Sequence, residues 1–141
     1  MQEVPGKLSI EEFTTLRTKA IGALDLSYSP YSKFRVGCAL LSESGDLFVG
    51  ANVENASYGA AICAERSTIV TAVLQGHRKF KAIGVSSDMV DEFISPCGIC
   101  RQSIREFGKE IEVYMFKKDG SCVMKTLEEL LPMSFGPEQL N

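Results

Sequence analysis

Three cysteines and one glutamate are the residues of this chain whose types and spacing could do chemistry. Cys97 and Cys100 form a Cys-x-x-Cys pair directly after Pro96. Cys63 stands two residues before Glu65. Thiolates are good zinc ligands, and a catalytic zinc keeps three protein ligands and leaves its fourth tetrahedral position to water. A carboxyl group beside such a water can carry its protons. We therefore predict that the three cysteines hold one zinc ion and that Glu65 is the catalytic proton carrier.

The same cysteines allow two alternatives. A Cys-x-x-Cys pair can be a redox dithiol, and a structural zinc site needs a fourth ligand. The available fourth ligands are Cys38, Cys122 and His77. The first two fall in expected strands, where half-buried thiols are common, and His77 follows a helix end, which is typical of a surface residue. A redox pair has no use for Cys63 and a structural site has none for Glu65, so a catalytic site is the preferred interpretation.

The charge of the site constrains this interpretation. Zinc with three thiolates carries a net negative charge, which makes it a poor activator of water unless nearby groups compensate. Both cysteine segments open expected helices, and each helix N-terminus contributes roughly half a positive charge. Arg66 could in addition donate hydrogen bonds to the sulfurs and give electrostatic support. The alternative is that Arg66 is simply a solvated side chain on its helix.

Short helices and strands must bring these residues together. Ser9 and Glu12 form a capping box before an apolar helical face that runs to about Tyr28. The apolar pattern and the turn residues predict helices over 63–74 and 97–107 and strands over 35–41, 47–52, 82–86 and 111–116. Because first-turn side chains lean over the open end of a helix, the two helix starts that carry the cysteines can face one point.

The end of the chain adds one strand and a tail. The segment 117–122 is too short for a parallel crossover and suits a tight turn, so a fifth strand should run antiparallel to the fourth. Residues 127–141 are typical of a short helix followed by an ordered, proline-bearing end. The predicted order is α-β-β-α-β-α-β-β-α, in one domain over residues 1–141.

Composition narrows the class of protein. Of the 141 residues 45% are hydrophobic and 23% are charged, which is typical of a globular domain. A net charge of −3 and a pI near 5.2 disfavour a polynucleotide partner. Five cysteines cannot all pair as disulfides, and neither a signal peptide nor an apolar stretch of about 18 residues is apparent. We therefore expect a cytoplasmic protein, also nuclear if the source is eukaryotic, without a membrane partner.

Several segments resemble the zinc-dependent nucleoside deaminases, whose signature is H-x-E followed by P-C-x-x-C. Within that family the chain is most similar to the short-chain cytidine deaminases. The segments that carry the resemblance are 31–37, 52–56, 63–66, 95–102 and 130–137. Cys63 stands where the general signature has histidine, which suits the short-chain branch with three cysteines. Polynucleotide and nucleotide deaminases more often have histidine there.

The resemblance and the element order together imply a three-layer α/β/α fold with a five-stranded mixed sheet. The resemblance also implies a homotetramer that serves pyrimidine salvage by hydrolysing the free nucleosides cytidine and deoxycytidine to uridine and deoxyuridine plus ammonia. In this hypothesis zinc lowers the pKa of a water, Glu65 takes its proton, and the oxygen attacks C4 of the cytosine ring. Glu65 then protonates N3 and the departing amine. A related alternative substrate is another aminopyrimidine nucleoside, such as a blasticidin-like antibiotic.

The substrate-binding residues follow from the resemblance. They are Phe34, Asn52, Glu54, Tyr58, Ala64 and Phe135. Asn52 and Glu54 would hydrogen-bond the ribose hydroxyls, while Phe34 would pack against the pyrimidine. Phe135, and with it Tyr58, would act at the site of a neighbouring subunit, so the active sites would be shared. Without the resemblance, Asn52 would be interpreted as a turn residue and Phe34 as a core aromatic.

Overall fold

The computed structural model describes residues 3–140. Its helices are α1 (Ile10–Gly22), α2 (Ala64–Leu74), α3 (Gly98–Arg105) and α4 (Leu127–Leu130). Its strands are β1 (Val36–Ser42), β2 (Leu47–Ala51), β3 (Phe80–Ser87), β4 (Glu112–Phe116) and β5 (Cys122–Thr126). The predicted order of elements is confirmed. Of the predicted domain over 1–141, residues 1, 2 and 141 lie outside the described part of the chain.

The five strands form one mixed sheet in the order β2-β1-β3-β4-β5. β3 and β4 run parallel, and the other neighbouring pairs are antiparallel. The antiparallel β4–β5 pair follows from its short connection, because a two-strand turn needs only a few residues whereas a parallel crossover needs a dozen or more. The parallel β3–β4 pair is joined through α3, which therefore lies over the sheet.

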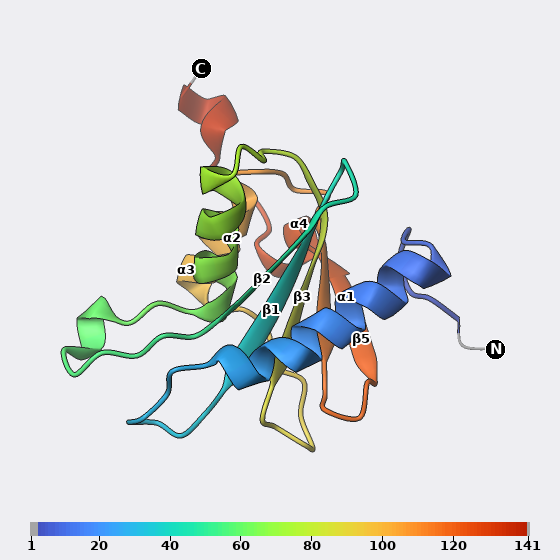
Figure 1. Ribbon diagram of the computed structural model, residues 1–141. Coiled ribbons are helices and arrows are strands. Elements are labelled where there is room, and N and C mark those ends of the chain that lie inside the picture. Colours follow the sequence, from blue (N-terminus) through green and yellow to red (C-terminus); the bar gives the residue numbers. More distant parts are fainter. Residues whose placement is uncertain (1–2, 141) are drawn as a thin grey trace.

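Helices cover both faces of the sheet, as Figure 1 shows. Successive strand residues point to opposite faces, so β1 directs Ala39 and Leu41 to one side and Cys38 and Leu40 to the other. On the first side α1 buries a cluster made of Leu8, Phe13, Leu16, Ala20, Ala39, Leu41, Ala82, Tyr114 and Phe116. On the other side residues of α2, α3 and α4 join a second buried cluster. The expected three-layer α/β/α fold is therefore confirmed.

The first helix begins as predicted and ends early. Ser9 Oγ accepts from the Glu12 N–H at 3.0 Å, and Glu12 Oε1 accepts from the Ser9 N–H at 3.0 Å, which completes the capping box. The helix was expected to reach about Tyr28 but ends at Gly22, followed by a 3-10 turn. The reason is that Tyr28 is extended: its N–H donates to Asn52 O at 3.0 Å, and its carbonyl accepts from Glu54 N.

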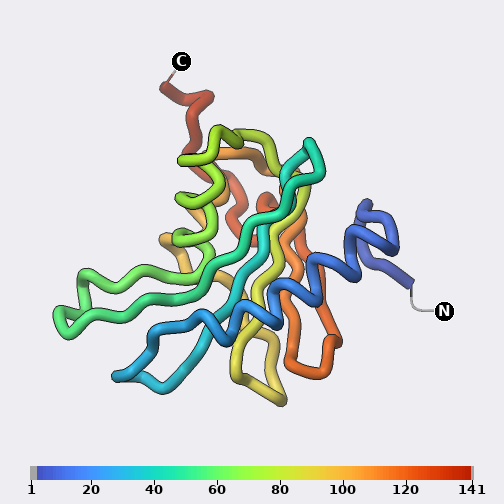
Figure 2. Tube along the Cα trace, in the orientation of Figure 1, coloured from blue at the N-terminus to red at the C-terminus, as the bar shows by residue number. Residues whose placement is uncertain are grey.

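The segment between β2 and α2 leaves the sheet and returns to it. Figure 2 traces this excursion, which projects from the body of the molecule before the chain enters α2. At its base Val53 and Ile62 exchange backbone hydrogen bonds of 3.0 and 2.9 Å. These bonds fix the point at which α2 begins. In residues 3–140 no helix is long and apolar enough to cross a membrane.

Candidate metal centre and active site

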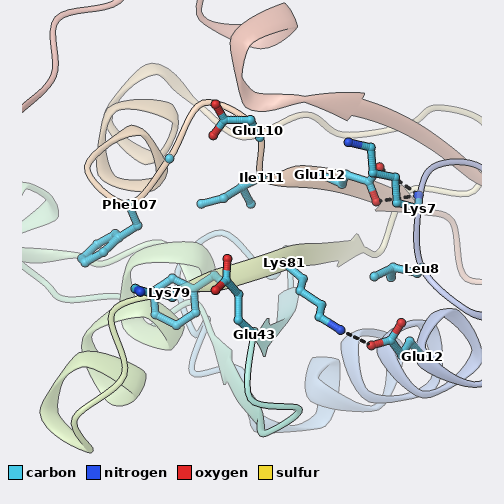
Figure 3. A pocket seen from close by; sticks show the side chains of 12 residues that line it. Lys7, Leu8, Glu12, Glu43, Lys79, Lys81, Phe107, Glu110, Ile111 and Glu112 are labelled. Atoms are coloured by element: carbon cyan, nitrogen blue, oxygen red, sulfur yellow. Dashed lines mark hydrogen bonds and ion pairs between the residues drawn. The ribbon is translucent and has the colours of Figure 1, made fainter. Parts of the chain in front are cut away.

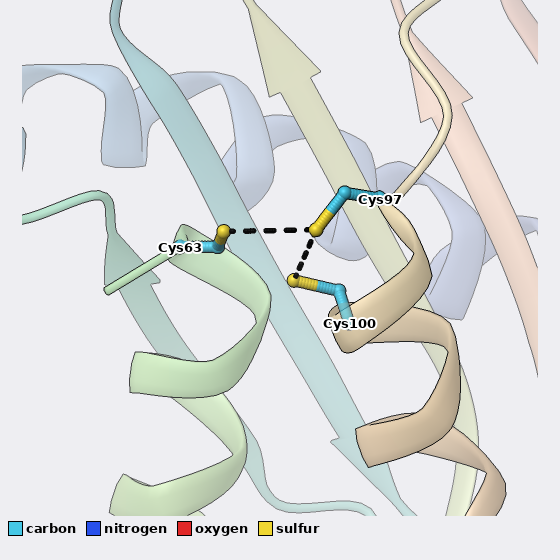
Figure 4. A group of neighbouring side chains, drawn as sticks. All are labelled: Cys63, Cys97 and Cys100. Atoms are coloured by element: carbon cyan, nitrogen blue, oxygen red, sulfur yellow. Dashed lines mark hydrogen bonds between the residues drawn. The ribbon is translucent and has the colours of Figure 1, made fainter. Parts of the chain in front are cut away.

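Cys63, Cys97 and Cys100 lie together at the starts of α2 and α3. The Cys97 sulfur is 3.9 Å from that of Cys63 and 3.6 Å from that of Cys100, and all three sulfurs lie within 4.8 Å of one another. Figure 4 shows the three side chains pointing toward one another from the two helices. Residues that are far apart in the sequence thus form one compact group of thiols.

Two of these cysteines are the N-caps of their helices. Cys63 caps α2 and Cys97 caps α3, and neither helix start has a side-chain cap hydrogen bond. An N-cap is normally Ser, Thr, Asp or Asn, whose oxygen accepts from a free N–H of the first turn. Here the positive ends of both helices face sulfur, which favours the thiolate form.

The arrangement fits a zinc ion. Sulfurs that each lie at about 2.3 Å from a tetrahedral zinc are separated from one another by about 3.8 Å. The two shorter sulfur distances, 3.6 and 3.9 Å, bracket that value. Among the described residues no fourth Cys, His, Asp or Glu joins the group, so three protein ligands are available. This donor set is typical of a catalytic zinc rather than a closed structural one.

Arg66 and the neighbouring thiols stabilise negative charge on Cys63. Hydrogen bonds from Cys100, Arg66 and Cys97 lower the pKa of Cys63 to about 5, although burial acts in the opposite direction. The same interaction with Cys63, together with burial, raises the pKa of Cys100 far above its usual range. These interactions therefore favour negative charge on Cys63 over Cys100. Zinc binding releases thiol protons, because the metal takes the thiolate form.

The guanidinium of Arg66 is directed at this charge. Its Nη2 lies 3.9 Å from the Cys63 sulfur, and its buried Nε–H finds no acceptor within residues 3–140. A buried donor without a partner is unfavourable unless it serves another purpose. The Nη2 end of the same guanidinium places positive charge beside the Cys63 sulfur.

Glu65 lies buried at the base of a cavity of about 270 Å³, with only 4% of its surface exposed. Burial, and the negative charge of Cys63, raise the pKa of the Glu65 carboxyl, while its own backbone N–H acts against this shift. A carboxyl with a raised pKa holds a proton more readily than an ordinary one, which suits a group that takes and returns protons. The cavity is lined by Val36, Asn52, Glu54, Ala61, Ile62, Cys63, Ala64, Glu65, Val85, Ile94, Ser95 and Cys97.

Asn52 and Glu54 line this cavity but also hold the backbone around it. Asn52 Oδ1 accepts from the Val36 N–H at 3.0 Å and from Ser27 Oγ at 2.5 Å, and its Nδ2 donates to Phe34 O at 2.9 Å. Glu54 accepts from the backbone N–H groups of residues 31 and 32 at 3.0 and 3.1 Å, and from the Ser32 hydroxyl. The Ser32 hydroxyl bond lowers the pKa of Glu54.

The three aromatic candidates lie outside the cavity that holds Glu65. Phe34 is half-buried and its side chain is not part of the cavity wall. Tyr58 is 78% exposed on the projecting segment, with its ring 6.1 Å from that of Tyr31, and lines a second cavity that shares Glu54 with the first. Phe135 is 57% exposed in the C-terminal tail, where its carbonyl accepts from Gln102 Nε2 at 2.9 Å. One chain therefore does not bring Phe135 to its own Glu65.

The other three candidate ligands lie away from the sulfurs. Cys38 is buried in β1 and Cys122 is half-buried at the start of β5, as expected for core thiols. His77 is partly exposed and lies outside the thiol cluster, as expected, but its side chain also makes contacts that the sequence did not indicate. Its ring packs edge-on against Phe48, with centroids 4.7 Å apart, and its Nε2 lies 3.6 Å from Asp46, so the side chain is only 25% exposed. The hairpin turn folds over the end of α2, and this contact could not be predicted from His77 alone.

Sequence reasoning missed part of the cavity wall. Ile94 and Ser95 line it, and both belong to an irregular segment between β3 and α3. Their place just before Pro96 and a helix start that was expected to face the site was the available signal. Ala61 and Ile62 precede Cys63 in the same way on the other side.

A larger cavity, of about 370 Å³, lies at the opposite end of β3 (Figure 3). Two of its carboxylates already have partners: Glu12 Oε2 lies 2.8 Å from Lys81 Nζ, and both Glu112 oxygens accept from the backbone N–H of Lys7 at 3.0 Å. These bonds attach the N-terminal segment and α1 to the sheet. The lining includes none of the three clustered cysteines, so this cavity is separate from the thiol site.

Comparison with known proteins gives consistent results. Residues 11–116 match the family described as the cytidine and deoxycytidylate deaminase zinc-binding region. The chain is 45% identical over 130 residues to a probable cytidine deaminase of Dictyostelium discoideum, covering 92% of this chain and 88% of that protein. It is 43% identical over 120 residues to the cytidine deaminase of Sporosarcina psychrophila, covering 84% and 88%. The crystal structure of cytidine deaminase from Burkholderia pseudomallei matches with a TM-score of 0.83 at 39% identity, covering 91% of this chain and 100% of that one.

Proposed function

The chain belongs to the cytidine and deoxycytidylate deaminase family, and we infer that Cys63, Cys97 and Cys100 hold its zinc while Glu65 carries the protons of the reaction. It is a zinc-dependent enzyme that hydrolyses cytidine and deoxycytidine to uridine and deoxyuridine plus ammonia. One observation supports the residue assignment: the three sulfurs lie within 4.8 Å of one another, and two of the cysteines, Cys63 and Cys97, line the cavity in which Glu65 is buried.

In the mechanism one carboxyl group carries both protons of the attacking water in turn. Zinc, when bound, supplies a Lewis acid that lowers the pKa of water. Glu65 accepts a proton from that water, and the water oxygen forms a bond to C4 of the cytosine ring. Glu65 passes this proton to N3, then takes the remaining proton from the new C4 hydroxyl and gives it to the amino group, whose bond to C4 breaks as ammonia leaves and a C4 carbonyl forms. The raised pKa of Glu65 supports this role, because the group must hold the proton between steps.

We propose that Glu54 and Asn52 bind the sugar hydroxyls. The lowered pKa of Glu54 keeps it anionic, and an anionic carboxylate is a strong acceptor for hydroxyl groups. Asn52 uses its oxygen and one N–H on the backbone, and an amide group has a second N–H to donate. Ala64, fully buried in the cavity wall, would enclose the pyrimidine, whereas the Phe34 side chain lies outside that wall and would reach the ring only if it turned inward.

We further propose a homotetramer in which Phe135 and Tyr58 act at a neighbouring subunit's site. The exposure of both aromatic side chains, 57% and 78%, supports the proposal, because large apolar surfaces are seldom left in water without a partner. The assembly would have a mass four times that of the chain.

We also propose a role in pyrimidine salvage, in the cytoplasm and, in a eukaryotic cell, also in the nucleus. A single domain over residues 1–141 is part of the same proposal.

The residue assignment is tested by Glu65→Gln. We expect bound zinc to stay at the wild-type level, because the amide removes only the titratable group, while uridine formation falls by about 10²- to 10⁴-fold. Zinc content and the loss of cytidine absorbance are measured on the same preparation. Glu11→Gln is the matched control, since Glu11 is exposed on α1 and far from the cavity in the fold. Turnover near wild type in Glu65→Gln would remove Glu65 from the mechanism.

Substrate profiling separates the remaining candidate within the same chemistry. Cytidine, deoxycytidine and a blasticidin-like aminopyrimidine nucleoside are compared at equal concentration. We expect cytidine and deoxycytidine to have higher kcat/KM values than the blasticidin-like nucleoside.

A further inference from the structure

Each of the three guanidinium nitrogens of Arg101 donates a hydrogen bond to a different neighbour. Its Nε donates to Pro96 O at 2.7 Å, its Nη1 donates to Leu130 O at 2.6 Å, and its Nη2 donates to Ser95 Oγ at 3.0 Å. The side chain is half-buried on α3. A planar guanidinium has its donors in a fixed fork, so three acceptors around one group specify its position closely.

Two of the three acceptors belong to the segment directly before α3, and the third belongs to the end of α4. Ser95 lines the cavity, and Pro96 is the residue before Cys97, the N-cap of α3. Leu130 is the last residue of α4, where helix carbonyls are left without intrahelical partners. Arg101 therefore joins the approach to a zinc ligand, the helix that carries it, and a neighbouring helix end.

The approach to Cys97 needs such a contact because it has little regular structure. Residues 88–97 form neither helix nor strand. The start of this segment is fixed by a hydrogen bond of 3.2 Å from the Asp88 N–H to Arg35 O, and Lys117 Nζ lies 4.4 Å from the centre of the Phe93 ring. At the end nearest the sulfurs, Arg101 supplies the side-chain hydrogen bonds.

We propose that Arg101 is a positioning residue that fixes Cys97 and the Ser95 wall of the cavity and thereby slows the release of zinc. The inference rests on the proposed assignment of Cys97 as a zinc ligand. Arg101 acts through the Ser95–Pro96 backbone and side chain rather than through contact with the metal. Outer groups that orient metal ligands typically change metal affinity by about 10- to 100-fold when they are removed.

Arg105 provides a matched control on the same helix. It is 2% exposed, and it also makes three side-chain hydrogen bonds: Nε to Ser134 Oγ at 2.6 Å, and Nη2 to both Glu138 oxygens at 2.9 Å. These bonds hold the C-terminal tail instead of the segment before Cys97. Replacing Arg105 thus weakens the attachment of α3 to its surroundings without touching residues 95–97.

The test measures how fast zinc passes from the purified enzyme to a chromogenic chelator, below the melting temperature of every variant. We expect Arg101→Met to release zinc about 10- to 100-fold faster than wild type, and Arg105→Met to stay within about twofold of wild type. Arg101→Lys keeps the charge and can reach one acceptor, so we expect an intermediate rate. This variant also serves if Arg101→Met does not fold.

The outcomes separate this inference from the proposed function. Wild-type release rates in Arg101→Met, or in Arg101→Lys if only that variant folds, would overturn the role of Arg101 while leaving the zinc site intact. Equal acceleration in Arg105→Met would also overturn it, because general loosening of α3 would then explain the effect. A wild-type protein that binds no zinc would instead overturn the proposed function, and this inference with it.

Discussion

At Cys63 three effects act on one sulfur. It caps α2, so the positive end of the helix faces it, and Arg66 Nη2 lies 3.9 Å away. The hydrogen bond from Cys100, with those of Arg66 and Cys97, lowers its pKa to about 5. A thiolate stabilised in this way donates less charge to a bound metal, which leaves the metal a stronger acid. The protein groups around Cys63 would thus tune the acidity of the metal that the sulfur holds.

Arg66→Met tests this electrostatic role. We expect zinc to remain bound, because all three sulfurs are present, while kcat falls by roughly 10- to 100-fold since the thiolate charge is no longer offset. Zinc content and kcat for cytidine are the measurements. Arg66→Lys, which keeps a positive charge, should lose less activity. A wild-type kcat in Arg66→Met would show that Arg66 is only a solvated helix residue.

The helix starts that carry the thiols could be predicted from local signals. Pro96 marks the start of α3, and a glycine after each helix marks its end. Gly76 has a positive φ of 95°, which is typical of the residue that stops a helix. The end of α1 could not be predicted, because Tyr28 pairs with backbone that lies far along the chain. For the same reason spacing did not show that Asn52 and Glu54 anchor the segment before β1. Their partners are backbone groups that only the folded sheet brings near.

The distance between α2 and the sheet depends on how closely the helix packs against β2. Ser67 Oγ donates to Ala51 O at 2.9 Å, and a Cβ placed on Gly50 would lie only 2.4 Å from Thr68 Oγ1 and 2.7 Å from Ser67 Oγ. The absence of a side chain at Gly50 therefore allows α2 to pack this closely on β2. Since α2 carries Glu65 in its first turn, this contact also affects the position of the carboxyl that we propose to be catalytic.

Gly50→Ala should force α2 away from β2. We expect the free energy of unfolding to fall by about 1–3 kcal/mol, as for other overpacked interior sites, together with a lower kcat. Denaturant unfolding and the cytidine assay are the measurements. Gly22→Ala is the control, because Gly22 is helical with φ −61° and a Cβ there meets nothing within 4 Å. It should leave stability unchanged or raise it by about 0.4–1 kcal/mol. Equal stability of Gly50→Ala and wild type would contradict the close-approach argument.

At the scale of the whole molecule, neither of the two aromatic side chains implied by the family resemblance covers the Glu65 cavity within one chain. Glu65 is buried at its base, yet Tyr58 and Phe135 are 78% and 57% exposed and leave it uncovered. The tail that carries Phe135 is nevertheless firmly attached, since Arg105 binds Glu138 at 2.9 Å. An ordered aromatic side chain that faces outward suits the proposal that it completes the site of another subunit.

Mixed assemblies test whether sites are shared. Phe135→Ala and Glu65→Gln subunits are unfolded, mixed in equal amounts and refolded together. If Phe135 acts at a neighbour's site, random assembly gives roughly a quarter of sites with both intact groups, so activity rises well above that of either parent. If each chain uses its own Phe135, every site lacks one group and the mixture has only the mean activity of the parents. Each variant refolded alone is the control.

The central claim is that Cys63, Cys97 and Cys100 hold the zinc on which deamination depends. The most direct test is the zinc content and uridine formation of Cys97→Ala beside Cys122→Ala, which removes a half-buried thiol of β5 outside the cluster. We expect Cys122→Ala to keep one zinc per chain and its activity, and Cys97→Ala to lose both, because two thiolates leave the site one ligand short. Full zinc occupancy in Cys97→Ala, or deamination that persists without zinc, would contradict the account.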